Sequence, residues 1–191
     1  MSLTFVTGPV RSGKSRFAER LAVESGGDVT YVATARTDSD DAEWVARIAH
    51  HVARRPASWR TVETGIPGAP TLATLAGGGR AGTVLLVDSL GTWLAAEMSA
   101  RFEVGGEPAS LDSDALDAAC TGAADALAAS AAHAIVVGDE AGWGLVPPYP
   151  SGRVFRDVLG RMQQRLAARA ERAYLVVAGY AIDLRAAGRH V

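Results

Sequence analysis

The fold is decided by the stretch Gly8-Pro9-Val10-Arg11-Ser12-Gly13-Lys14-Ser15, a G-x-x-x-x-G-K-S loop between an apolar run and a helical segment. Residues 3–7 are apolar and β-branched and residues 16–22 are helix formers, so strand, loop and helix follow in the order that a P-loop requires. The two glycines allow backbone N–H groups to converge on an anion, and the helix directs its positive end to the same place. The loop therefore predicts a triphosphate site.

Lys14 is the only lysine in the chain, and the other long cationic side chains are all arginine. An arginine fork is too broad to replace a compact ammonium against a phosphate oxygen. The alternative interpretation, a glycine-rich turn before an ordinary helix, does not explain why lysine is kept at this position. We therefore expect Lys14 to take part in catalysis on a phosphate and Ser15 to hold a magnesium ion.

Length and composition limit the classes of protein that fit. The chain has 191 residues, of which 48% are hydrophobic, and we expect a single domain. A net charge of -2 argues against nucleic acid as the main partner. The single cysteine, Cys120, excludes an internal disulfide and a cysteine-based zinc cluster. Neither a signal peptide nor an apolar run of the roughly 20 residues that span a bilayer is present, so we expect a cytoplasmic protein without a membrane span.

Apolar runs and helical segments alternate along the chain, which predicts an α/β fold with a mainly parallel sheet and helices on both faces. The sequence predicts strands over 3–7, 28–34, 59–63, 83–88, 134–138 and 174–179. Helices are expected from Asp40, capped with Glu43, to Pro56, and over 89–98, 112–132 and 153–172, with an irregular connection over 99–110.

Acidic residues come directly after two of the buried strands. Asp88 closes the apolar run 83–87, and Asp139 and Glu140 follow the run 134–138. The carboxyl ends of parallel strands are where such sheets bind ligands. Asp88 is therefore the candidate Walker B acid, predicted to share the magnesium ion with Ser15.

Two adjacent histidines, His50 and His51, lie in the predicted helix that ends at Pro56, where arginines flank them. A neutral imidazole, with an ordinary pKa of about 6.5, is a competent nucleophile toward phosphorus, and nearby arginines can stabilise the transition state. On spacing alone, a solvated helix with inert histidines is the commoner interpretation. A metal ion shared by both histidines is disfavoured, because helix neighbours point apart.

Several separate stretches occur in the same order as in a known family. They are Thr7 to Ser15; Tyr31 to Ala35; Arg47 to His51 with Arg55-Pro56 and Trp59 to Glu63; Val87 to Leu90 with Trp93-Leu94; Glu140 to Pro147; and Phe155 to Asp157 with Gln164 to Ala167 and Val176 to Gly179. Through them the chain resembles, along nearly its whole length, the bifunctional adenosylcobinamide kinase/adenosylcobinamide-phosphate guanylyltransferases of cobalamin biosynthesis, the CobU family.

The resemblance implies a RecA-like P-loop fold and two successive reactions on adenosylcobinamide. ATP or GTP first phosphorylates the hydroxyl of the aminopropanol arm. GTP then guanylylates a histidine, with release of pyrophosphate, and the GMP passes to the new phosphate to give adenosylcobinamide-GDP. That histidine matches His50, with His51 as the positional runner-up. The resemblance thus reverses the preference for inert histidines.

The resemblance also implies roles for residues around the nucleotide. Lys14 and the loop amides hold the triphosphate, Ser15 and Asp88 the Mg²⁺, and Glu63 helps to fix the guanine nucleotide. Further contacts are expected from Ala33, Thr34, Ala35, Arg54 and Arg55. The alternatives are an ordinary strand end for Thr34, a solvated helix terminus for the arginines and a surface acid for Glu63. Trp143 and Tyr149 either pack on the corrin or are buried under their own loop. The family also suggests a homotrimer.

The chain departs from the family pattern only in its second half. Asp139 and Gln163 stand where asparagine is usual, Gly91-Thr92 departs after a strand, and Tyr180-Ala181 stands where a proline is common. These positions concern the corrinoid side and leave the nucleotide half untouched. Two other functions remain open: a P-loop kinase without guanylyltransferase activity, and a nucleotide-dependent RecA-like assembly module.

Overall fold

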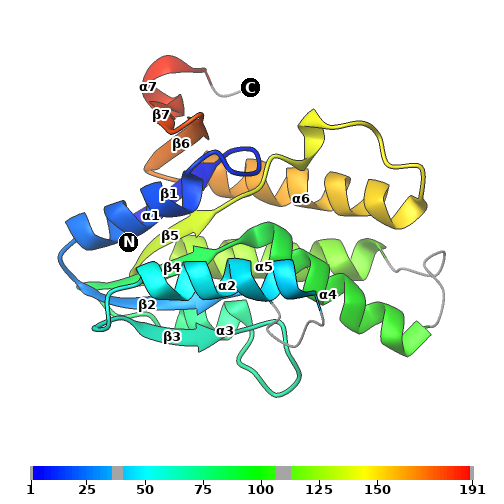
Figure 1. The fold of residues 1–191 in the computed structure, drawn as a ribbon, viewed down its shortest axis with the longest axis horizontal. Coiled ribbons are helices and arrows are strands. Elements are labelled where there is room, and N and C mark those ends of the chain that lie inside the picture. The colour runs from blue at the N-terminus through cyan, green and yellow to red at the C-terminus, as the bar shows by residue number, and fades with distance from the viewer. Residues whose placement is uncertain (1, 36–40, 106–112, 190–191) are drawn as a thin grey trace.

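The structure, a computed structural model, describes residues 2–35, 41–105 and 113–189, and a seven-stranded sheet forms its middle layer (Figure 1). The order across the sheet is β3-β2-β4-β5-β1-β6-β7, and the strands are parallel except for β7, which pairs antiparallel with β6. The strands are β1 (Ser2–Thr7), β2 (Asp28–Ala33), β3 (Arg60–Glu63), β4 (Thr83–Asp88), β5 (His133–Val137), β6 (Arg172–Val177) and β7 (Tyr180–Asp183). The predicted mainly parallel sheet is confirmed.

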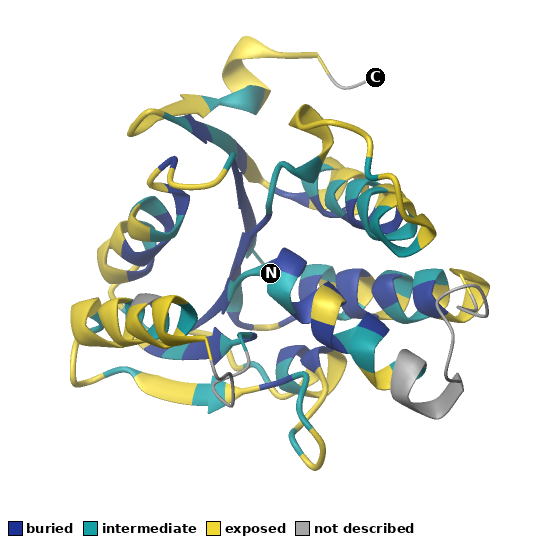
Figure 2. Cartoon of the chain, turned by 45° about the vertical axis from the view of Figure 1, so that its right-hand side comes forward, coloured by how far each residue is buried: buried dark blue, intermediate teal, exposed yellow. Residues whose placement is uncertain are grey.

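Helices cover both faces of the sheet (Figure 2). One face carries α1 (Lys14–Glu24) and α2 (Ala42–Arg54). The other carries α3 (Leu72–Gly77), α4 (Leu90–Gly105), α5 (Ser113–Ala129) and α6 (Pro150–Arg169). A short 3-10 helix, η2 (Ala141–Trp143), follows β5, and α7 (Leu184–Ala187) follows β7. No helix in these described ranges is both long and apolar enough to cross a membrane.

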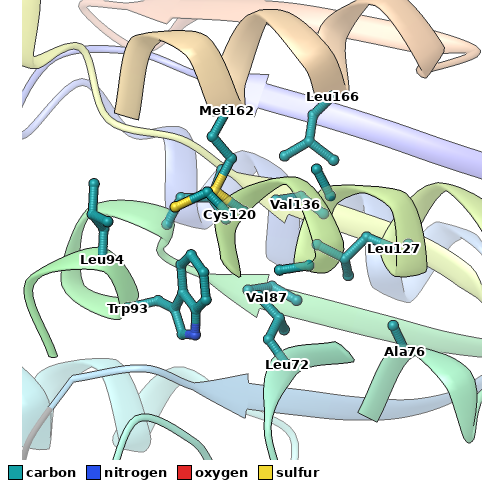
Figure 3. Close-up of a cluster of buried hydrophobic side chains, with 14 of the residues drawn as sticks. Leu72, Ala76, Val87, Trp93, Leu94, Cys120, Leu127, Val136, Met162 and Leu166 are labelled. Carbon is teal, nitrogen blue, oxygen red and sulfur yellow. The ribbon is translucent and has the colours of Figure 1, made fainter. Parts of the chain in front are cut away.

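The central strands are apolar on both sides because each is covered on both faces. In β4, Leu85 and Val87 belong to the core under α3 to α6, whereas Val84 and Leu86 belong to the core under α1. Figure 3 shows the first of these cores, in which Cys120 lies among leucine, valine and methionine side chains. Burial raises the pKa of the Cys120 thiol to about 12, so the thiol stays protonated and unreactive. Both cores hold the carboxyl ends of the central strands in one rigid frame.

Several helix boundaries differ from the sequence prediction: α6 begins and ends three residues earlier than predicted, α5 ends three residues earlier, and α4 and the cap of α2 differ as follows. An irregular connection was predicted over 99–110, but α4 continues to Gly105, so the prediction is wrong for residues 99–105. The rest of that segment lies within residues 106–112, outside the described ranges. Arg101 supports the extra turns by donating to the carbonyl and the carboxylate of Glu97 one turn earlier, at 2.7 and 2.8 Å. Helix α2 is capped by Asp41, which accepts from two backbone N–H groups; the predicted cap, Asp40, is not among the described residues.

The hairpin formed by β6 and β7 was missed by the sequence prediction, which ended its last strand at Gly179. Ala178 and Gly179 adopt positive φ values of 51° and 83° and join the paired residues Val177 and Tyr180. Two central residues with positive φ match the twist of a tight hairpin, but such turns are usually marked by Asn-Gly rather than Ala-Gly. The weak turn signal explains why β7 went unpredicted.

Candidate functional site

The P-loop runs from β1 to α1 as predicted, and its two glycines are required by geometry. Gly13 has a φ of 96°, a left-handed conformation that favours glycine. At Gly8, a Cβ atom would collide with the carbonyl oxygen of Val176 on the neighbouring strand. Helix α1 begins at Lys14, so its free N–H groups and positive dipole end face the loop. Pro9, Val10, Arg11 and Ser12 complete the turn, and the Arg11 side chain is 82% exposed.

Lys14 lies between the P-loop and the carboxyl end of β5. Its side chain is 10% exposed, and its Nζ is 3.0 Å from Asp139 Oδ1 and 3.2 Å from the carbonyl oxygen of Pro9. The other Asp139 oxygen accepts from the backbone N–H of Gly91 at 3.0 Å. In this arrangement Asp139 neutralises the ammonium that the sequence assigns to the phosphates. The sequence placed Asp139 at a strand end without identifying Lys14 as its partner, and the expectation that Asp139 leaves the nucleotide half untouched is wrong.

Asp88 lies at the end of β4 and contacts the first turn of α1 across the end of β5. Its side chain is 8% exposed, and it accepts from the hydroxyls of Ser15 at 3.2 Å and Tyr31 at 2.8 Å. Desolvation raises the pKa of Asp88, and the hydrogen bonds from Tyr31 and Ser15 and the nearby His51 counter only part of this rise. The predicted pair of Ser15 and Asp88 is thus brought together, and Tyr31 is a partner that sequence patterns did not reveal.

Because Asp88 is desolvated, we expect Asp88→Asn to stabilise the folded chain at neutral pH. The folded chain keeps the Asp88 proton to a higher pH than the unfolded chain, whose carboxyl titrates near pH ~4. The contribution of Asp88 to stability is therefore fully present below that pH and is lost as the pH rises through the folded-state pKa. We expect the Tm at pH 8 to rise by about 2–4 °C, as for ~1 kcal/mol in a chain of this size.

Thermal unfolding of both proteins across the pH range measures this effect. The difference in Tm between Asp88→Asn and wild type should disappear toward pH ~4, where both side chains are neutral. A Tm difference that stays constant with pH would show that ionisation of Asp88 is not the cause.

Thr34 is buried directly behind Asp88. Its hydroxyl accepts from the backbone N–H of Ser89 at 2.7 Å, donates to the carbonyl of Ser89 at 2.8 Å and is hydrogen-bonded to the hydroxyl of Thr92. These bonds fix the turn that follows β4 and thereby the direction of the Asp88 carboxylate. Thr34 was predicted as a nucleotide contact; its hydroxyl is engaged with the protein in this structure.

A cavity of about 160 Å³ extends from Lys14 and Ser15, beneath α2, to Glu63 at the end of β3. We call it the Glu63 cavity. It brings together most residues that the sequence assigns to the nucleotide: Lys14, Ser15, Ala33, Thr34, Ala35, Arg55, Glu63 and Asp88. Its remaining lining includes apolar side chains of α2, namely Trp44, Ile48 and Val52. An apolar wall with a carboxylate at its far end suits a flat base that carries N–H donors.

A second cavity, which we call the His50 cavity, lies between α2 and the outer side of the P-loop. His50, His51 and Arg54 line it together with residues 11–15 of the P-loop, Arg16, Arg20 and Glu43. Lys14, Ser15 and His51 line both cavities, which therefore adjoin at the phosphate-binding lysine. The many cationic side chains suit a polyphosphate.

The two histidines point in different directions, as expected of helix neighbours. His50 is exposed toward the His50 cavity. His51 is turned toward the sheet: its Nδ1 lies 3.9 Å from Asp88 Oδ2 and 3.3 Å from Arg54 Nη2. Glu19, His51 and Asp88 place ligand atoms within 4.8 Å of one another, so this group could also hold a cation.

Arg54 and Arg55, both predicted as nucleotide contacts, have different surroundings. Arg54 forms two hydrogen bonds to the carboxylate of Glu19 on α1, at 2.9 and 3.3 Å, which tie the end of α2 to α1. Arg55 stacks on the ring of Tyr31 at 3.6 Å, and its buried Nε has no hydrogen-bond partner within the described part of the chain. A buried orphan donor in the wall of the Glu63 cavity is a group that a bound ligand could satisfy.

Trp143 and Tyr149, for which burial was one of two expectations, are exposed by 60% and 59%. They lie in the segment between β5 and α6, whose first residues contact the P-loop. The backbone N–H of Glu140 donates to the carbonyl of Gly8 at 3.2 Å, and its carboxylate accepts from Thr7 at 2.7 Å.

These features define a P-loop nucleoside-triphosphate-binding protein. The G-x-x-x-x-G-K-S loop follows β1, its serine is hydrogen-bonded to the acid at the end of β4, and its lysine lines two adjoining cavities. The match to known sequences is more specific. Residues 4–184 match the family described as cobinamide kinase / cobinamide phosphate guanyltransferase, and the chain belongs to that family.

Curated relatives match over nearly their whole length. The bifunctional adenosylcobalamin biosynthesis protein CobP of Pseudomonas aeruginosa is 39% identical over 180 residues, which cover 94% of this chain and 95% of that protein. The proteins named CobU from Salmonella typhimurium and Escherichia coli are 36% and 35% identical over 190 residues, covering 96% of this chain and 99% of each relative.

A solved structure described as a prototypical ATPase from the type III secretion system of pathogenic bacteria superposes with a TM-score of 0.53 at 11% identity. The match covers 98% of this chain, which spans only 58% of that structure. At this identity the likeness concerns the fold alone, and it agrees with the predicted α/β architecture with a mainly parallel sheet.

Proposed function

We propose that this chain catalyses both reactions of its family, phosphorylation of adenosylcobinamide and transfer of GMP from GTP to the product, in the cytoplasm, where both nucleotides are available. The observation that carries the proposal is the pair of cavities that meet at Lys14 and Ser15. The Glu63 cavity offers a base site, and the His50 cavity offers a nucleophile beside the same phosphate-binding loop.

In the kinase reaction, Lys14 and the loop amides hold the triphosphate. The hydroxyl oxygen of the corrinoid arm forms a bond to the γ-phosphorus, the bond from that phosphorus to the bridging oxygen breaks, and the hydroxyl proton passes to solvent. The ammonium of Lys14 has three N–H donors and contacts Asp139 and the Pro9 carbonyl, so a donor remains for a phosphate oxygen. The main contribution of the protein is positioning and charge neutralisation.

Mg²⁺ fits the oxygen donors at the junction of the two cavities. Ser15 Oγ and Asp88 Oδ1 lie 3.2 Å apart, and hard oxygen ligands are what this ion prefers. When bound there, it would neutralise charge that develops on the phosphate oxygens. Ser15 and Asp88 would hold it, and Tyr31 and Thr34 would keep Asp88 in place.

In the guanylyltransferase reaction, a ring nitrogen of His50 forms a bond to the α-phosphorus of GTP, and pyrophosphate leaves. An oxygen of the corrinoid phosphate then forms a bond to that phosphorus while the N–P bond breaks. The covalent intermediate divides the joining of two anions into two displacements. Glu63 would accept from the N–H groups of the guanine, and Arg54 and Arg55 would lie beside its phosphates.

Label position in the nucleotide tests this function. With [α-³²P]GTP and no corrinoid, we expect acid-labile label on the protein; with [γ-³²P]GTP we expect none. With adenosylcobinamide and γ-labelled nucleotide, label should appear on the corrinoid. Transfer from the γ position without protein-bound α label would identify a kinase alone. Nucleotide-dependent oligomerisation without either product would identify the assembly module.

A further inference from the structure

An unusual surface lies in the segment between η2 and α6. Leu145 and Val146 are exposed by 96% and 71%, and Trp143 and Tyr149 flank them with more than half of their surfaces in solvent. We call these four side chains the apolar platform. Isolated exposed hydrophobic residues are common, but four within seven residues form a contiguous apolar run that marks a binding surface.

The backbone of the platform is held in place by two arginines of α6. Arg156 donates to the carbonyls of Leu145 and Gly142 at 2.9 and 2.8 Å. Arg153 donates to the carbonyls of Pro147 and Pro148 at 2.9–3.1 Å. The two arginines of α6 thus satisfy backbone carbonyls of the segment, while the four apolar side chains of the platform remain exposed to solvent. A rigid apolar surface binds a ligand with little loss of conformational entropy.

The platform is continuous with the phosphate site. The segment leaves β5 at Asp139 and Glu140, which contact Lys14 and the backbone of Gly8, and then passes along α6 (Figure 1). A molecule lying on the platform can therefore direct an arm to the phosphate beside Lys14. Neither cavity offers a comparable apolar surface for a large acceptor: the Glu63 cavity has only about 160 Å³, and the His50 cavity, although it has about 770 Å³, is lined by six charged side chains beside the phosphate loop.

We infer that the apolar platform binds the corrin ring of the acceptor, with its aminopropanol arm extended to Lys14. This inference rests on the proposed function. A corrinoid is a broad, flat macrocycle with methyl groups on its faces and amides around its rim. Leu145 and Val146 match the methylated face. The indole N–H of Trp143 and the hydroxyl of Tyr149 can form hydrogen bonds with the rim amides while their rings stay in apolar contact with the macrocycle.

Two serine substitutions and a matched control test the platform. Leu145→Ser and Tyr149→Ser should each weaken adenosylcobinamide binding about 10-fold or more, because the apolar contact is lost. Val23→Ser also replaces an exposed apolar side chain by serine, at a residue that is 58% exposed near the end of α1, and should leave binding unchanged. Equilibrium dialysis with the coloured corrinoid gives the Kd, and kinase assays give the KM values for corrinoid and ATP separately.

The readouts separate this inference from the proposed function. Labelling of the protein by [α-³²P]GTP needs no corrinoid and should be normal in both platform variants, as should the KM for ATP. Unchanged corrinoid Kd and KM in Leu145→Ser would overturn the inference. Light scattering tests the alternative that a second copy of the chain occupies the platform. If Leu145→Ser lowers the oligomeric state while the corrinoid affinity is unchanged, the platform is a contact between copies of the chain. Absence of α label in wild type would instead count against the proposed function.

Discussion

Lys14→Met is expected to lower both the γ-phosphoryl transfer to adenosylcobinamide and the α-label on the protein by about 10²–10³-fold, the usual cost of removing one preorganised charge from a transferring phosphate. The Nζ of Lys14 occupies a narrow space between the Pro9 carbonyl and Asp139, within a side chain that is 10% exposed. Both reactions use the same triphosphate cradle, so one substitution should impair both. Radiolabel assays of each half-reaction measure the two losses.

Lys14→Arg is the sharper variant, because it keeps the charge and changes only the shape. A guanidinium is wider than an ammonium and presents a planar fork, so we expect it to rescue neither reaction. Arg161→Lys is the matched control: it exchanges the same two residue types at an exposed side chain of α6, paired with Asp117 outside both cavities, and should be silent. Retention of more than about a tenth of either activity by Lys14→Arg would contradict the argument that a compact ammonium is required here.

The residues of the phosphate half of the site could be predicted because each is marked by a short, contiguous sequence pattern. A contiguous motif fixes Gly8, Gly13, Lys14 and Ser15, and an apolar run that ends in an acid identifies Asp88 without reference to any other segment. In the structure Ser15 and Asp88 lie 3.2 Å apart, because β5 separates β1 from β4 and leaves their carboxyl ends on one edge of the sheet; their shared magnesium ion stays a prediction.

The partners of these residues could not be predicted, since they depend on the order of strands in the sheet. Asp139 reaches Lys14 only because β5 pairs directly with β1, and Tyr31 reaches Asp88 only because β2 pairs with β4. Neither pairing is encoded in a short pattern. Thr34 illustrates the same limit: its position at a strand end predicted a ligand contact, whereas its hydroxyl bonds depend on the turn after β4.

The choice between His50 and His51 was open in the sequence for a related reason. Helical periodicity shows that neighbours diverge, but which of them faces the sheet depends on how α2 is rotated against α1. The bonds between Arg54 and Glu19 join the two helices at one end. With α2 so placed, His51 is directed to Asp88 and His50 to the cavity beside the P-loop.

His50→Ala is therefore expected to reduce protein-bound α-label from GTP to background, whereas His51→Ala should retain it at a reduced rate. A nucleophile needs an accessible lone pair beside the α-phosphorus, and His50 is exposed in the cavity that the P-loop lines. The Nδ1 of His51 is within 3.3 Å of Arg54 and faces the carboxylate proposed to hold Mg²⁺. Its loss should disturb the orientation of Asp88 and slow both reactions together.

These two variants control for each other, because the same change is made at neighbouring positions of one helix. In His50→Ala the γ-phosphoryl transfer to adenosylcobinamide should persist, which shows that the fold and the triphosphate site are intact, and only adenosylcobinamide-GDP should fail to form. The opposite result, label retained in His50→Ala and lost in His51→Ala, would assign the nucleophile to His51.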